Sequence, residues 1–246
     1  MPQTVDYAFA VLFAVVVSLF EYFVFWPRFR DAIRSGAPDA RVRGYRRVVI
    51  GQWTFAIAAL AIWRAYDRPL GALGLSTPTG WRLVVGVGII VAIVYLAAAQ
   101  IRSVSRTTAE RRVALRPRLG TLAFMLPHTT DERGWFIALS VTAGVCEELL
   151  YRGYLVWVLQ PWLGLIGAAL ASVVLFGLGH GYQGRNGLVR ATLAGAVMAT
   201  VVLVTHWLVP AMVVHAVIDA SAGMVGYALL SGERGAGTGV RVAGSG

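Results

Sequence analysis

Two adjacent glutamates and an arginine interrupt a strongly apolar part of this sequence. Glu147 and Glu148 stand next to each other, and Arg152 follows four residues after Glu148. Charged side chains at membrane depth are costly and are usually functional. Residues four apart lie on one face of a helix, so Glu148 and Arg152 are predicted to pair. Glu147 is rotated by about 100° from Glu148, and its carboxylate is therefore the one left available for chemistry.

Two more polar positions with the same spacing follow on later apolar segments. Phe176 precedes His180 by four residues, and His215 precedes Asp219 by four. If these helices bundle, Glu147, His180 and the His215/Asp219 pair converge on one cavity inside the protein, and Glu147 gains its partners only from these later spans. A buried glutamate beside an imidazole suits general-base activation of water.

These three motifs, in this order on successive apolar segments, resemble the signature of the CPBP family. Its members are the CAAX-protease and bacteriocin-processing membrane proteins, also called Abi or Rce1-like proteins. Thr142-Ala143-Gly144 before the glutamate pair and Tyr151-Arg152-Gly153-Tyr154-Leu155 after it agree with that signature. The resemblance covers about Asp131 to Gly223, and the residues before about 125 carry no motif that we can use.

The resemblance implies a glutamate-dependent intramembrane endopeptidase similar to CAAX prenyl endopeptidases. Glu147 would be the general base that activates water, and His180 would help to hold or polarise that water. His215 and Asp219 would stabilise the tetrahedral oxyanion. The implied supporting residues are Glu148, Arg152 and Phe176.

Asp219 departs from the family pattern, which usually has Asn at this position. An ionised Asp cannot donate a hydrogen bond to an oxyanion, so Asp219 is either protonated by burial, orients His215, or binds a metal. Family members have also been called metalloproteases. Glu147, His180 and His215 could provide three ligands to Zn²⁺ or another divalent metal with one open position. No cofactor is certain, and the helical His-Glu-x-x-His motif is absent.

Composition places the chain in the membrane. Of its 246 residues, 57% are hydrophobic and 14% are charged, and the mean hydropathy is +0.67, outside the range of ordinary soluble domains. All 22 basic residues are Arg, and they fall in short loops between apolar runs, which is a topology signal and not a nucleic-acid footprint. The single cysteine, Cys146, excludes an internal disulfide framework.

The apolar runs predict an all-α, polytopic transmembrane helical bundle of about seven spans. An eighth is possible if 119–126, too short to cross alone, helps to build another span; otherwise that segment is an interfacial helix or a re-entrant piece. Three regions follow: N-terminal spans and basic loops at 1–127, a catalytic membrane core at 128–230, and a disordered tail at 231–246. The predicted spans are about 7–26, 48–65, 81–100, 134–159, 162–180, 188–205 and 211–230.

Charged and aromatic residues predict the orientation of the chain in the membrane. The basic segments 28–47 and 102–118 should stay cytoplasmic, which places the N-terminus outside and the C-terminus inside, in the plasma membrane. Glu21 is expected to reach the headgroups near the end of the first span. Tryptophans near span ends predict an interfacial belt: Trp26, Trp63, Trp81, Trp135, Trp162 and Trp207.

The expected partners are the lipid bilayer and a peptide or protein substrate that enters from the membrane or the cytoplasmic face, with no nucleic acid. The expected substrate is a CAAX-like peptide, a leader peptide, a bacteriocin precursor or a segment of a membrane protein. Two other functions remain open: a proton or ion pathway through Glu147, His180, His215 and Asp219, and a catalytically silent immunity or scaffold protein. One geometric difficulty is that His180 and His215 approach from opposite sides, so a shared site needs a mid-membrane cavity, tilted helices or a short sixth span.

Overall fold

The structure, a computed structural model, describes residues 1–231. This part of the chain is helical and contains no strand, so the predicted all-α transmembrane bundle is confirmed. The tail predicted to be disordered, 231–246, lies outside the described residues except for Ser231.

The described residues form α-helices joined by short 3₁₀ and π segments. The α-helices are α1 (Thr4–Val11), α2 (Ser18–Phe20), α3 (Trp26–Arg34), α4 (Ala40–Ala65), α5 (Trp81–Ser105), α6 (Ala109–Leu115), α7 (Thr130–Glu148), α8 (Val156–Gly179), α9 (Gly184–Thr205) and α10 (Leu208–Leu230). The π segments are η1 (Leu12–Val17), η2 (Glu21–Phe25) and η5 (Leu149–Leu155). The 3₁₀ segments are η3 (Leu70–Leu73), η4 (Arg116–Met125) and η6 (Gly181–Gln183).

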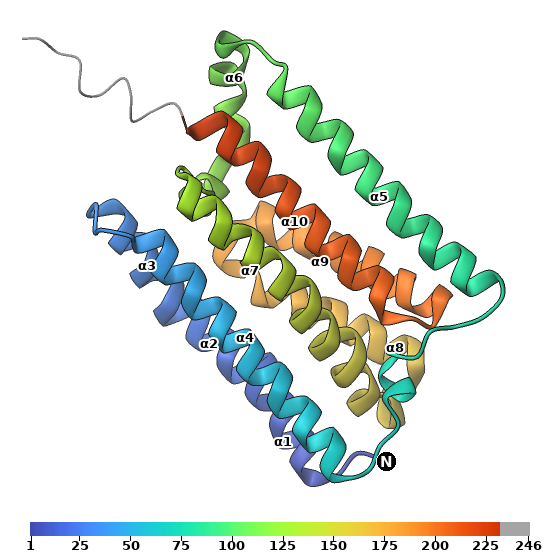
Figure 1. The fold of residues 1–246 in the computed structure, drawn as a ribbon. Coiled ribbons are helices and arrows are strands. Elements are labelled where there is room, and N and C mark those ends of the chain that lie inside the picture. Colours follow the sequence, from blue (N-terminus) through green and yellow to red (C-terminus); the bar gives the residue numbers. More distant parts are fainter. Residues whose placement is uncertain (232–246) are drawn as a thin grey trace, which may run out of the picture.

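Six helical stretches of the described chain are long and apolar enough to cross a membrane, so this is a multi-pass membrane protein. They are Thr4–Arg34, Ala40–Ala65, Trp81–Ser105, Thr130–Gly179, Gly181–Thr205 and Leu208–Leu230. The longest joins the predicted fourth and fifth spans. It is broken at Gly164, whose φ of 65° and ψ of 172° are not helical, and Figure 1 shows the chain turning back within α8.

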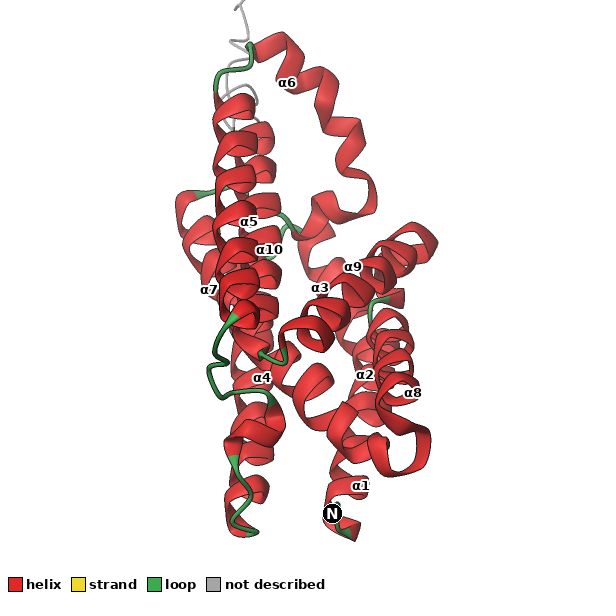
Figure 2. Cartoon of the chain, turned by 90° about the vertical axis from the view of Figure 1, so that its right-hand side faces the viewer, coloured by secondary structure: helices red, strands yellow, loops and turns green. Residues whose placement is uncertain are grey.

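The helices pack in two layers. In the first layer α7 lies between α4 and α10, and α5 packs on the other side of α10 (Figure 1). The second layer contains α1 to α3, α8 and α9, as the rotated view in Figure 2 shows. The helix that carries both glutamates is therefore enclosed by neighbours on several sides, as charged groups in a membrane bundle require.

A capping box marks the start of α7. The Thr129 hydroxyl accepts a hydrogen bond from the Glu132 backbone N–H at 3.2 Å, and the Glu132 carboxylate accepts one from the Thr129 backbone N–H at 3.2 Å. This capping box satisfies two of the free N–H groups at the helix start. It fixes where α7 begins and hence how deep Glu147 and Glu148 lie.

The segment 119–126 does not form an eighth span. Most of it belongs to η4, and Gly120 breaks that segment with a φ of 55°. At the start of η4, Arg116 Nε donates to the Leu229 carbonyl oxygen at 2.8 Å. This segment therefore covers the end of α10.

The prediction of an interfacial tryptophan belt is only partly correct. Trp81 and Trp162 are 60% and 75% exposed, as a belt requires, but Trp26 and Trp63 are 5% and 0% exposed. Trp26 stacks on Tyr182 with ring centroids 3.8 Å apart. For the buried members, packing between helices replaces contact with headgroups.

A second buried charge pair fastens the N-terminal helix to the bundle. Asp6 is fully buried and accepts two hydrogen bonds from Arg68 at 2.7 Å and one from the Tyr154 hydroxyl at 2.6 Å. The hydrogen bonds that the Arg68 guanidinium donates to Asp6 raise the pKa of Arg68, which also lies over the Trp157 ring at 4.5 Å. The network ties α1, the loop after α4 and η5 together.

We therefore expect Asp6→Asn to destabilise the protein, because it leaves the Arg68 charge buried without its partner. The expected loss is about 3 kcal/mol, as for breaking a buried ion pair, measured from reversible unfolding in detergent micelles. Asp67→Asn is the control, because Asp67 is exposed and Asn tolerates its left-handed φ of 49°. Equal stabilities of the two variants would contradict the role of the network.

Candidate active site

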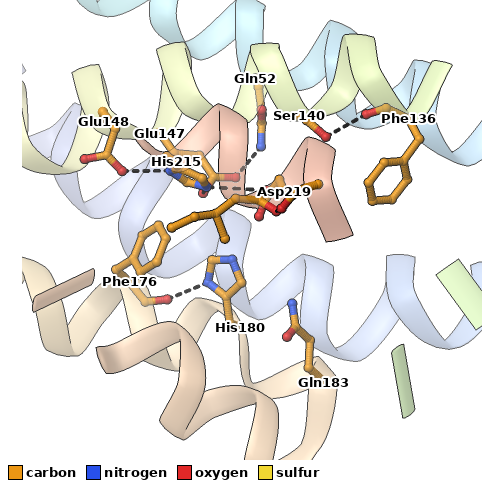
Figure 3. A network of polar contacts seen from close by, with 12 residues as sticks. Gln52, Phe136, Ser140, Glu147, Glu148, Phe176, His180, Gln183, His215 and Asp219 are labelled. Atoms are coloured by element: carbon orange, nitrogen blue, oxygen red, sulfur yellow. Dashed lines mark hydrogen bonds and ion pairs between the residues drawn. The ribbon is translucent and has the colours of Figure 1, made fainter. Parts of the chain in front are cut away.

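Glu148 is the most enclosed charge of the candidate site. Its carboxylate is 0% exposed, and Oε1 accepts a hydrogen bond from Arg152 Nη1 at 3.0 Å. The same oxygen lies 2.8 Å from His215 Nδ1, which must carry the proton because a carboxylate only accepts (Figure 3). The four-residue pair expected from the sequence is present, and His215 adds a third member from α10.

Glu147 points to a different set of neighbours. Its Oε1 accepts a hydrogen bond from Gln52 Nε2 on α4 at 2.5 Å, and its Oε2 lies 3.9 Å from His215 Nε2. Oε2 is buried and has no hydrogen-bond partner among the described residues. The expectation that Glu147 gains partners only from the later spans is wrong, because α4 packs beside α7.

Gln52 is the site residue that sequence reasoning missed. It belongs to the part of the chain before about residue 125, which carries no recognisable motif, so the site was predicted from the later spans alone. A usable signal was present nonetheless, since an amide side chain stands within the first turns of the apolar span predicted at 48–65. Polar groups at such depth have a partner inside the bundle.

Asp219 lies one helical turn from His215 on α10. Its Oδ2 is 3.5 Å from His215 Nε2, and its side chain is 43% exposed, compared with 6% for His215. His215 thus stands between a fully buried carboxylate at Nδ1 and two less buried ones at Nε2. At 3.5 and 3.9 Å, both Nε2 contacts are longer than ordinary hydrogen bonds.

Phe176 connects His180 to the rest of the site. The Phe176 ring centroid lies 4.5 Å from that of His180 and 5.9 Å from that of His215, and the Arg152 guanidinium lies 4.1 Å above the Phe176 ring. His180 Nδ1 is 2.8 Å from the Phe176 carbonyl oxygen, which fixes the ring and leaves Nε2 free. In Figure 3 the His180 imidazole points toward Asp219.

The structure therefore brings most of the predicted residues together, but not all in direct contact. Among the described residues, no ion pair within 4.0 Å joins His180 to Glu147. Glu21, predicted to reach the headgroups, lies on η2 within electrostatic range of Glu147. The N-terminal helix thus also borders the site.

Two glycines allow this close assembly. A Cβ on Gly144 would lie 2.6 Å from the Met212 carbonyl oxygen and 2.7 Å from the Ala216 Cβ, both on α10. A Cβ on Gly195 of α9 would lie 2.8 Å from Arg152 Nη2. The missing side chains let α10 approach Glu148 and let α9 cover Arg152.

The π segment η5 begins directly after the glutamate pair. It runs from Leu149 to Leu155 and contains Arg152. π turns within α-helices are rare and are frequent at functional sites. Here the change of helix type falls between Glu148 and its partner, so the pair is held across a junction that four-residue spacing alone does not reveal.

The candidate metal ligands do not form a metal site. No group of three His, Cys, Asp or Glu side chains in the described part of the chain is arranged to hold a metal ion. His215 Nδ1 is engaged by Glu148, and His180 Nδ1 contacts the Phe176 carbonyl oxygen. The residues present therefore do not fit a three-ligand zinc centre.

A large cavity lies outside the candidate site. It has a volume of about 1010 Å³ and lies between the α3–α4 loop and the start of α7. Three arginines and three acidic residues line it and balance one another in charge, so it shows no preference for an anion or a cation. Its charged lining residues are Asp39, Arg41, Arg43, Arg46, Asp131 and Glu132.

Comparison with protein families agrees with the motifs. Residues 129–221 match the family model described as type II CAAX prenyl endopeptidase Rce1-like. Over these residues the chain is similar to that family. The resemblance predicted from the three motifs is confirmed, and the Rce1-like segment contains both glutamates and both histidines of the site, whereas Gln52 and Glu21 lie outside it. No curated protein and no solved structure matches the chain significantly.

We expect Gly144→Ala to destabilise the protein by roughly 1–3 kcal/mol, the usual cost of overpacking. The added methyl group meets the backbone of α10, which cannot move as a side chain does. Gly134→Ala on the same helix is the control, since nothing lies within 4 Å of its added Cβ. Thermal unfolding in nanodiscs measures both, and an equal or higher midpoint for Gly144→Ala would refute the close approach of α7 and α10.

Proposed function

We propose that this protein is an intramembrane endopeptidase that hydrolyses a peptide bond with a water molecule activated by Glu147. The observation that carries the proposal is the difference in burial and in contacts between two adjacent carboxylates. Each carboxylate has an Oε2 without a hydrogen-bond partner among the described residues. Glu148 is fully buried and its Oε1 is held by Arg152 and His215, whereas the Glu147 side chain is 16% exposed and its Oε2 lies 3.9 Å from His215 Nε2. The Rce1-like match supports CAAX-type protease activity.

The chemistry follows from the positions of these groups. Glu147 Oε2 takes a proton from water, the hydroxyl oxygen adds to the scissile carbonyl carbon, and the C–N bond breaks as that proton passes to the leaving amine. His180 Nε2, left free by the Phe176 carbonyl contact, is the second group that polarises the water. No covalent acyl-enzyme is needed.

His215 is the group best suited to stabilise the oxyanion. Its Nδ1–H is held by Glu148, which fixes the ring, and its Nε2 makes only long contacts to Glu147 and Asp219. When the ring is doubly protonated, the state that its three neighbouring carboxylates stabilise, Nε2–H can donate to a negative charge that develops nearby. Of the three roles expected for Asp219, its position fits the orientation of His215.

The substrate class in this proposal is a membrane-associated peptide of CAAX, leader or bacteriocin type. Asp219 and Glu147 are the exposed members of the site, with side chains 43% and 16% exposed, so a peptide would approach from their side. The basic segments 28–47 and 102–118 favour a cytoplasmic position for their end of the bundle.

Glu147→Gln should abolish cleavage while the protein stays folded, because an amide cannot accept the proton from water. The expected loss in rate is about 10²–10⁴-fold, measured in proteoliposomes with an internally quenched farnesylated CAAX peptide and the same peptide without the farnesyl group. Retained cleavage in Glu147→Gln would overturn the proposal. A wild type that cleaves neither peptide but conducts protons would replace it with an ion pathway.

Asp219→Asn should keep activity within about tenfold of the wild type, because Asn, the usual residue of the family pattern at this position, can still contact His215. Asp219→Leu removes that contact and should lose roughly 10–100-fold, the usual cost of losing a group that orients a functional histidine. The same peptide assay measures both variants. Equal activities of the Asn and Leu variants would show that Asp219 does not orient His215.

A further inference from the structure

Gln52 is the only described side chain that donates a hydrogen bond to Glu147. The bond from Nε2 to Oε1 is 2.5 Å long, and hydrogen bonds to a charged acceptor are short and strong. His215 Nε2 is 3.9 Å from the other oxygen, and Glu21 repels the carboxylate. The orientation of Glu147 therefore depends on an amide from α4, outside the Rce1-like segment.

The amide oxygen of Gln52, Oε1, indicates what else this side chain could bind. Since a carboxylate only accepts, Nε2 must face Glu147, and Oε1 is then an acceptor. Gln52 Oε1 is buried and, like Glu147 Oε2, has no hydrogen-bond partner among the described residues. Two unpaired acceptors in one apolar site are costly, and they are complementary to a water molecule and to a peptide N–H group.

We propose that Gln52 is a positioning and substrate-binding residue: its Nε2–H holds the Glu147 carboxylate, and its Oε1 accepts a backbone N–H of the peptide. The inference rests on the proposed function. It gives α4 a part in the reaction that the three motifs do not contain. It also explains why an amide, with a donor and an acceptor on one planar group, stands at this depth in the bundle.

Three variants separate the two contacts. Gln52→Leu removes donor and acceptor, and Gln52→Glu removes the donor but keeps an acceptor at nearly the same size. Thr54→Val is the control on the same helix, because the Thr54 hydroxyl is exposed and donates to the Ile50 carbonyl oxygen of its own helix. Each is measured as the full chain in proteoliposomes with the quenched farnesylated peptide.

We expect kcat to fall roughly 10–100-fold in Gln52→Leu and Gln52→Glu, as when an orienting partner is lost. KM should rise only in Gln52→Leu, which has lost the acceptor for the peptide N–H. Thr54→Val should match the wild type, and the thermal midpoints should stay close together. Unchanged kcat, or a fall in kcat that only follows loss of folded protein, would overturn the proposal.

A second measurement does not require cleavage. Dicyclohexylcarbodiimide adds to carboxyl groups in apolar surroundings, and mass spectrometry locates the adduct on Glu147. The rate of adduct formation on Glu147 should rise about tenfold in Gln52→Leu, because that variant loses a hydrogen bond to a charged group. The rate should not change in Thr54→Val. If the wild type cleaves no peptide, the proposed function fails, and an unchanged labelling rate in Gln52→Leu then shows separately that Gln52 does not hold Glu147.

Discussion

The structure depends on keeping one negative charge, that of Glu148, inside an apolar bundle. An ionised carboxylate without partners is too costly at membrane depth, and here Arg152 and His215 compensate it from η5 and α10. Three elements are thereby fixed to one atom, Oε1. The absence of a side chain at Gly144 and at Gly195 follows from the same requirement, because α10 and α9 must come close enough to enclose the group.

Glu147 and Glu148 are adjacent in sequence, but their side chains have different neighbours in the structure. The rotation between neighbouring helical residues directs one carboxylate toward α10 and Arg152 and the other toward α4. The more exposed of the two has its unpaired oxygen beside His215 Nε2. A fully buried carboxylate held by two donors beside a more accessible one is a simple way to orient the reactive group.

Much of this arrangement could be predicted from the sequence, because it depends on local spacing. Hydrophobic length predicted the membrane helices, and four-residue spacing predicted the Glu148–Arg152 and His215–Asp219 faces. Contacts between spans were harder to predict. Periodicity says which residues share a face, but not which helix that face meets, so the place of Gln52 and the burial of Trp26 and Trp63 were missed. The roles of the site residues remain predictions.

The break at Gly164 has a consequence for the surrounding lipid. The part of α8 after it, 165–179, contains only fifteen residues, about 22 Å of helix at ~1.5 Å per residue, whereas the hydrocarbon core is ~30 Å thick. Its end, and His180 with it, therefore stops short of one membrane surface. The bilayer must thin there or admit water, so the composition of the membrane itself becomes a variable that sets how well hydrated the candidate site is.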